Sequence, residues 1–156
     1  MQFEIVNTTA QPMLYVTRSS SMNSEEIGGV MGDAFAAIGE FINRSGVAPA
    51  GPPLAVYRDW DGSTMKVDVG FPVAPDSAVS SEPEVRSGQT PAGKALKAVH
   101  RGSYMRLRET YEAMEVHIAQ EGLTAGEIAW EVYVSDPDQT SEEDLLTEIY
   151  MRVNGA

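Results

Sequence analysis

The sequence predicts an α+β domain in which one order of elements, strand-strand-helix-strand-strand, occurs twice. Two segments have apolar residues at helical spacing, short apolar runs flank both, and the order repeats after about half of the 156 residues. Two such halves would form an antiparallel sheet of about eight strands. We expect two main helices on one face of this sheet and a ligand cleft on the other.

The first half contains one helix between two pairs of predicted strands. Asn23 or Ser24 can cap the helix, and Gly46 can end it. Asp61 and Gly62 form a dipeptide typical of a hairpin turn between the last two strands. The predicted strands cover residues 3–6, 13–16, 54–57 and 65–73.

The second half repeats this order. Ser103 is the expected cap of its helix, and Gly122 is the expected end. The apolar face of this helix consists of Tyr104, Leu107, Tyr111, Met114 and Ile118. The predicted strands cover residues 84–86, 94–100, 128–134 and 146–153.

The length predicts a single domain over residues 1–156, with repeat halves 1–75 and 84–156. A segment rich in Ser, Pro and Glu, residues 75–91, links the halves. With 42% hydrophobic and 22% charged residues, the composition is that of an ordinary globular protein.

Composition also excludes several kinds of function. The net charge of −12 repels phosphate backbones, so we expect no direct nucleic-acid partner and a preference for cationic small molecules. The chain has no cysteine, which removes thiol catalysis and cysteine-ligated metals. Nucleotide-binding fingerprints and metalloprotease motifs are absent, so no cofactor and no metal are expected. Without a signal peptide or membrane-length apolar stretch, we expect a soluble cytoplasmic protein.

The predicted strand from Trp130 to Val134 carries the strongest functional signal. Side chains alternate along a strand, so Trp130 and Val132 share one face while Glu131 and Tyr133 share the other. We expect the first set to pack under the helices, which places the carboxylate and the phenol on the uncovered face. A glutamate among apolar strand residues is costly to bury unless its charge is compensated. Alternatively, Glu131 lies exposed or pairs with an Arg or Lys on a neighbouring strand.

Two further segments contribute candidate residues. Glu148 and Tyr150 share one face of the last strand and could meet Glu131 across the hairpin. Pairing of Glu148 with Lys97 or Arg152 is the alternative. At the junction before the second helix, Gly102 and Ser103 fit a turn with a cap, whereas His100 and Tyr104 are candidates for the rim of a pocket.

Three segments of the second half resemble a known family in their order along the chain. They are VHRGSY at residues 99–104, WEVYVSDP at 130–137 and TEIY at 147–150. The chain resembles the GyrI-like small-molecule-binding domain, also called the AraC-type effector-binding domain. The family often has a proline after Ile-Tyr-x, where this chain has Arg152.

The resemblance implies the same fold over the whole chain and a cleft between the halves, as in bacterial multidrug-sensing relatives. It implies that Glu131 is the central acid that contacts cationic ligands. Members are often fused to a helix-turn-helix domain, for which this chain leaves no residues, so we expect a stand-alone binder. The candidate ligand-binding residues are Glu131, Tyr133, Tyr104, His100, Tyr57, Trp60, Tyr15, Phe71, Glu148 and Tyr150.

Three functions therefore compete. The first is binding of lipophilic, aromatic and cationic compounds through Glu131. The second is hydrolysis of electrophilic natural products of the cyclopropanoid type, with Glu131 activating water and Tyr133 orienting or protonating the substrate. The third is interaction with a protein partner, as in gyrase inhibition.

Overall fold

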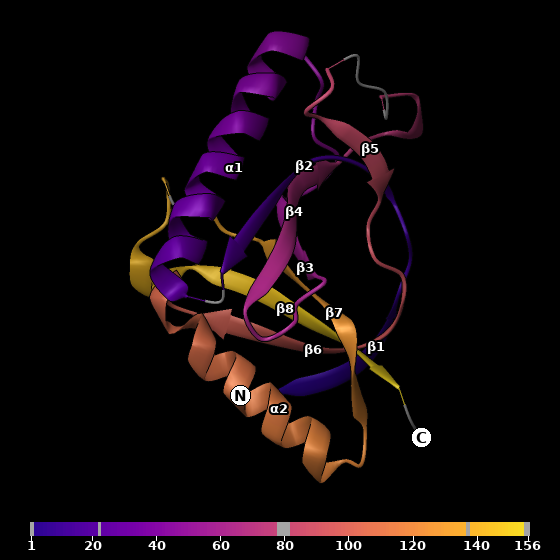
Figure 1. The fold of residues 1–156 in the computed structure, drawn as a ribbon, viewed down its shortest axis with the longest axis vertical. Helices are drawn as coiled ribbons and strands as arrows, with labels where there is room; N and C mark the ends of the chain where they lie inside the picture. The colour runs from indigo at the N-terminus through magenta and orange to yellow at the C-terminus, as the bar shows by residue number, and fades with distance from the viewer. Residues whose placement is uncertain (1, 22, 78–81, 137, 155–156) are drawn as a thin grey trace. The chain divides into compact units, whose positions relative to one another are not determined.

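A computed structural model describes residues 2–21, 23–77, 82–136 and 138–154 (Figure 1). The chain divides into two compact units. We call Met1–Thr8 together with Ala92–Ala156 the C-terminal unit, and Thr9–Pro91 the N-terminal unit. Eight antiparallel strands and two main helices lie in the described residues, which confirms the predicted α+β fold.

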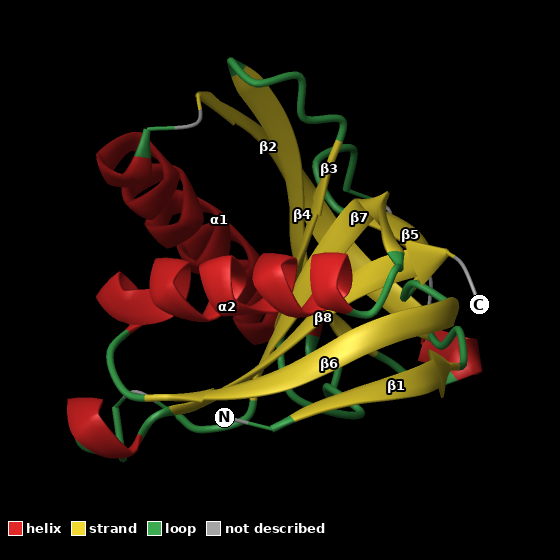
Figure 2. Ribbon diagram, turned by 90° about the horizontal axis from the view of Figure 1, so that it is seen from below, coloured by secondary structure: helices red, strands yellow, loops and turns green. Residues whose placement is uncertain are grey.

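The C-terminal unit contains four strands in the order β1-β6-β8-β7, with each neighbouring pair antiparallel. The helix α2 lies over one face of these strands (Figure 2). The elements are β1 (Phe3–Thr8), β6 (Gly93–Arg101), α2 (Leu107–Gln120), β7 (Thr124–Tyr133) and β8 (Leu146–Asn154).

The helix α2 is preceded by a 3₁₀ turn at Tyr104–Arg106, and the Ser103 side chain caps this turn by accepting from the backbone N–H of Met105. The cap residue is therefore the predicted one, but Tyr104 lies before α2 rather than within it. The buried face of α2 consists of Thr110, Met114 and Ile118, which follow each other at intervals of four residues.

The N-terminal unit repeats the plan with strands in the order β3-β4-β2-β5, again antiparallel. The helix α1 packs on β2 and β4 (Figure 1). The elements are β2 (Pro12–Ser21), α1 (Ser24–Ser45), β3 (Leu54–Arg58), β4 (Thr64–Pro72) and β5 (Arg86–Gln89).

The predicted ends of α1 are both confirmed. The Asn23 side chain accepts from the backbone N–H groups of Glu25 and Glu26, which have no partner within the helix. Gly46 follows the helix with φ at 72°, and its N–H donates to the Ile42 carbonyl. This left-handed conformation favours glycine, so the sequence signal and the geometry agree.

The first and fifth strands pair outside their own half of the sequence repeat. β1 precedes the first helix in the chain, yet it pairs with β6 of the C-terminal unit. β5 lies within the predicted linker 75–91 and in the predicted second half, yet it pairs with β2 of the N-terminal unit. The compact units therefore differ from the predicted halves 1–75 and 84–156. Within the predicted linker 75–91, residues 78–81 lie outside the described residues.

Candidate functional site

Glu131 lies on β7 and is buried, with 3% of its surface exposed. The hydroxyl of Tyr133 donates to its Oε1 at 2.6 Å, and the hydroxyl of Tyr111 donates to its Oε2 at 2.6 Å. Both oxygens of the carboxylate thus accept a short hydrogen bond from a phenol. The burial excludes the alternative that Glu131 lies exposed on a strand surface.

The structure corrects the face on which Glu131 lies. Tyr111 belongs to α2, so its bond to Glu131 places the carboxylate on the face that α2 covers. Trp130 lies on the opposite face, where its ring stacks on that of Tyr150 at 5.2 Å with an interplanar angle of 6°. The strand alternation was predicted correctly, but the face covered by the helix was assigned the wrong way round.

Glu148 and Tyr150 consequently do not join Glu131. In the register of β7 and β8, Trp130 pairs with Tyr150 and Val132 pairs with Glu148, so all four share the face away from α2. There Lys97 Nζ approaches Glu148 Oε2 at 3.4 Å, and the Tyr150 hydroxyl donates to Glu148 Oε1 at 2.9 Å. The alternative prediction, in which Glu148 pairs with Lys97, is therefore the correct one.

Tyr104 contacts the group formed by Glu131, Tyr111 and Tyr133, which we call the phenol–carboxylate group. Its ring meets the edge of the Tyr133 ring at a centroid distance of 5.6 Å. Burial raises the pKa of the Tyr104 hydroxyl above its ordinary value, and the negative charges of Asp136 and Glu131 raise it further. Tyr104 therefore keeps its proton at neutral pH and presents an uncharged aromatic surface.

His100 is buried behind the turn that carries Tyr104 rather than at a pocket rim. Its Nε2 lies 2.9 Å from the Ser103 carbonyl, and its Nδ1 lies 2.7 Å from the Thr110 hydroxyl. A carbonyl can only accept, so Nε2 donates to the Ser103 carbonyl, and the Thr110 hydroxyl is the partner of Nδ1. His100 thus ties the start of α2 to β6 and holds the turn in place.

Tyr111 was predicted only as a core residue of the second helix, and its part in the site was missed. The available signal was its position at the i+7 spacing from Tyr104 on the apolar face. A buried tyrosine normally places its hydroxyl against a polar partner. The sequence did not show that this partner would be Glu131, because the face of β7 under the helix was not known.

The four remaining aromatic candidates belong to the N-terminal unit. Phe71 is a core residue with 1% exposure, and Tyr15 lies against Gly88. Tyr57 is half-buried, with its hydroxyl 3.9 Å from the sulfur of Met31 on α1. Trp60 is half-buried in the loop between β3 and β4. Their contribution to ligand binding stays a prediction.

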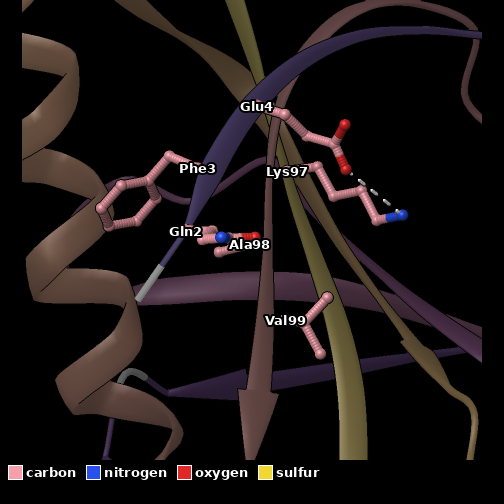
Figure 3. A pocket seen from close by; sticks show the side chains of 6 residues that line it. All are labelled: Gln2, Phe3, Glu4, Lys97, Ala98 and Val99. Atoms are coloured by element: carbon pink, nitrogen blue, oxygen red, sulfur yellow. Dashed lines mark ion pairs between the residues drawn. The ribbon is translucent and has the colours of Figure 1, made fainter.

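Two hollows are described in the C-terminal unit. The larger, about 630 Å³, lies at the β1–β6 edge, where Glu4 and Lys97 point toward one another and form an ion pair at 3.8 Å (Figure 3). Lys97 also lies 3.4 Å from Glu148, so two carboxylates share its positive charge. The smaller, about 300 Å³, is lined by Ser103, Tyr104, Met105, Thr140, Glu142 and Leu145. Tyr104 is thus a wall of this hollow and also contacts Tyr133 beside the buried carboxylate.

The described residues contain no group of three or more histidine, aspartate or glutamate side chains that could hold a metal ion. Within the same residues, no helix is both long and apolar enough to span a bilayer.

A family model of the GyrI-like small molecule binding domain matches residues 1–154. The chain belongs to this family. No curated protein matches the chain.

Solved structures of other proteins have the same fold. The EcmrR C-terminal domain superposes with a TM-score of 0.83 at 16% identity, covering 99% of this chain and 98% of that one. SAV2435, solved bound to tetraphenylphosphonium, has a TM-score of 0.71 at 13% identity, with coverages of 99% and 95%. A hydrolase encoded by lin2189 from Listeria innocua has a TM-score of 0.62 at 16% identity, with coverages of 98% and 92%.

Proposed function

We propose that this GyrI-like domain binds lipophilic aromatic cations and that Glu131 supplies the opposing charge. The observation that carries the proposal is a carboxylate with 3% exposure whose two described donors, Tyr111 and Tyr133, are phenols. Each phenol donates one hydrogen bond to the carboxylate, and its ring adds aromatic surface beside the buried acid. A cation placed beside Glu131 would offset the cost of removing the carboxylate from water.

Aromatic side chains around Glu131 suit the organic part of such a ligand. The rings of Tyr104 and Tyr133 pack in an edge-to-face arrangement, and Tyr104 also lines the small hollow. A cation over a tyrosine face gains about 0.5–2 kcal/mol, more when it is desolvated. The hollow beside Met105, which is 90% exposed, is the proposed entrance, and Tyr104, which lines it, also contacts Tyr133.

The fold neighbour SAV2435 was solved with tetraphenylphosphonium, a cation that has no hydrogen-bonding group. The same compound is the natural first probe for this chain, because only charge and aromatic contact can hold it. Titration calorimetry with wild type and Glu131→Gln tests the proposal. Loss of one partner of a buried charge pair costs about 2 kcal/mol or more, so we expect affinity to fall about 30-fold or more.

Glu148→Gln is the matched control, because it removes the same charge from the neighbouring strand on the opposite face. Glu148 already interacts with Lys97, so this variant should bind within about twofold of wild type. Triphenylphosphine oxide, a neutral analogue, should bind weakly to all three proteins. Equal binding of tetraphenylphosphonium by wild type and Glu131→Gln would refute the proposal.

A second candidate is hydrolysis of an electrophilic ligand, with Glu131 as base toward water and Tyr133 as the group that orients or protonates the substrate. The 2.6 Å bond between these side chains provides a direct path for a proton. The solved Listeria innocua hydrolase of the same fold supports testing it. Incubation of wild type with a cyclopropane-bearing electrophile should give a ring-opened product that Glu131→Gln does not form. Binding without formation of this product would refute hydrolysis and leave binding as the only supported function.

A further inference from the structure

The hydroxyl of Thr147 is buried without a hydrogen-bonding partner in the described part of the chain. Thr147 lies on β8 with 0% exposure, and its Oγ1 has no donor or acceptor within reach. Buried hydroxyls nearly always have a partner, because water bonded to them in the unfolded chain is lost on folding. A hydroxyl kept at this position against that cost requires an explanation.

The strand register places Thr147 beside the phenol–carboxylate group. Thr147 pairs with His100 on one side and with Tyr133 on the other, so the three side chains form a row on the face that α2 covers. Both ring nitrogens of His100 are already bonded, to Thr110 and to the Ser103 carbonyl. Glu131 is the diagonal neighbour of Thr147 across the β7–β8 pair.

In the other half of the duplicated fold, the residue at the matching position has no hydroxyl. In the N-terminal unit, Tyr57 on β3 pairs with Val67 on β4, as Tyr133 on β7 pairs with Thr147 on β8. Two residues before Tyr57 stands Ala55, at the place that Glu131 occupies before Tyr133. Valine and threonine have nearly the same shape. The half with Ala55 in place of the carboxylate has valine at the matching position, Val67. The half with Glu131 has threonine there, Thr147.

We propose that the Thr147 hydroxyl is a hydrogen-bonding subsite for the ligand that Glu131 binds, an inference that rests on the proposed function. The favoured ligand is an aromatic cation that carries an oxygen on a ring, hydroxyl or ether, at a distance from its charge. Diagonal neighbours on paired antiparallel strands are about 7–8 Å apart. One phenyl ring between a cationic phosphorus and a para oxygen spans a comparable distance.

The experiment compares two probes that differ by a single oxygen, tetraphenylphosphonium and (4-hydroxyphenyl)triphenylphosphonium. Their affinities are measured by titration calorimetry for wild type, Thr147→Val and Thr147→Ser. Wild type should prefer the hydroxylated probe by about three- to tenfold, as expected for one hydrogen bond. Thr147→Ser keeps the hydroxyl and should keep the preference. Thr147→Val should bind both probes with equal affinity.

Stability measurements separate this role from a structural one. Removal of an unpartnered hydroxyl should leave the urea unfolding midpoint of Thr147→Val at or above that of wild type. Thr17→Val is the control, because the Thr17 hydroxyl donates to Asp68 at 2.7 Å in the N-terminal unit. It should lower stability and keep the probe preference.

An unchanged probe preference in Thr147→Val, whatever its stability, overturns the inference while the Glu131 dependence of binding preserves the proposed function. Loss of that Glu131 dependence overturns both. A crystal structure of the complex with the probe oxygen beyond hydrogen-bonding distance from Thr147 Oγ1 would also overturn the inference.

Discussion

Replacement of Tyr111 by phenylalanine removes one of the two phenols that hold the buried carboxylate. The Tyr111 hydroxyl lies 2.6 Å from Glu131 Oε2, and Glu131 is 3% exposed, so water cannot readily replace the lost donor. The ring itself stays in place, and the change is confined to one hydrogen bond. We expect the folded protein to be destabilised because a buried charged oxygen loses its donor.

The magnitude follows from the charge of the acceptor. Hydrogen bonds to charged groups contribute about 1.5–3 kcal/mol, whereas bonds between neutral groups contribute about 0.5–1.5 kcal/mol. For Tyr111→Phe we expect a loss near 2 kcal/mol in the free energy of unfolding. For a chain of this length that corresponds to a fall of about 4–8 °C in Tm.

Urea denaturation followed by tryptophan fluorescence measures this loss, and a double-mutant cycle assigns it to the pair. In a Glu131→Gln background the phenol faces a neutral amide, so the cost of Tyr111→Phe should fall by about 1 kcal/mol. Tyr150→Phe is the comparison, since its hydroxyl donates to the half-buried Glu148 at 2.9 Å. Its cost should stay below about 1 kcal/mol, as expected for a solvent-accessible pair.

An equal cost of Tyr111→Phe in both backgrounds would show that the phenol does not act through the charge of Glu131. A cost below that of Tyr150→Phe would refute the reasoning from burial.

Three further predictions concern the N-terminal unit. At Gly70 an added Cβ would lie 1.9 Å from the Leu14 carbonyl oxygen, so Gly70→Ala should fail to give folded protein in circular dichroism and expression tests. Gly28 in α1 has nothing within 4 Å of such an atom, so Gly28→Ala should raise the free energy of unfolding by about 0.5–1 kcal/mol; a decrease would contradict this. In the β3–β4 hairpin, the backbone N–H groups of Thr64 and Ser63 hold the pKa of Asp61 below its ordinary value of 3.8. Its stabilisation is therefore complete above that ordinary value and is lost as the pH falls through the lowered pKa. Urea midpoints of wild type and Asp61→Asn should converge only in strong acid, and a constant difference across pH would argue against this role.

The sequence alone predicted the order of the elements and singled out Glu131 as a candidate residue. Local chemistry marks the ends of α1, because Asn23 can satisfy free N–H groups and Gly46 can adopt a left-handed conformation. Ser103 caps the turn before α2 for the same reason. Glu131 stood out because a charged residue among apolar strand residues is buried at a cost. These signals depend on neighbours within a few positions, which a single sequence displays directly.

The tertiary structure determined which face of β7 lies under α2, which strands pair, and which side chains contact Glu131 and Thr147. Alternation along β7 shows that Glu131 and Tyr133 share a face, but it does not show which face of the strand lies under a helix. In the structure, α2 packs on the face that carries Glu131 and Tyr133. Strand order in a sheet depends on contacts between distant segments, so the exchange of β1 and β5 between the repeat halves has no local signal. Thr147 acquires its position beside Tyr133 only through the register of β7 and β8. Side chains remote in sequence meet where packing free energy is lowest, and no pattern within one strand encodes that meeting.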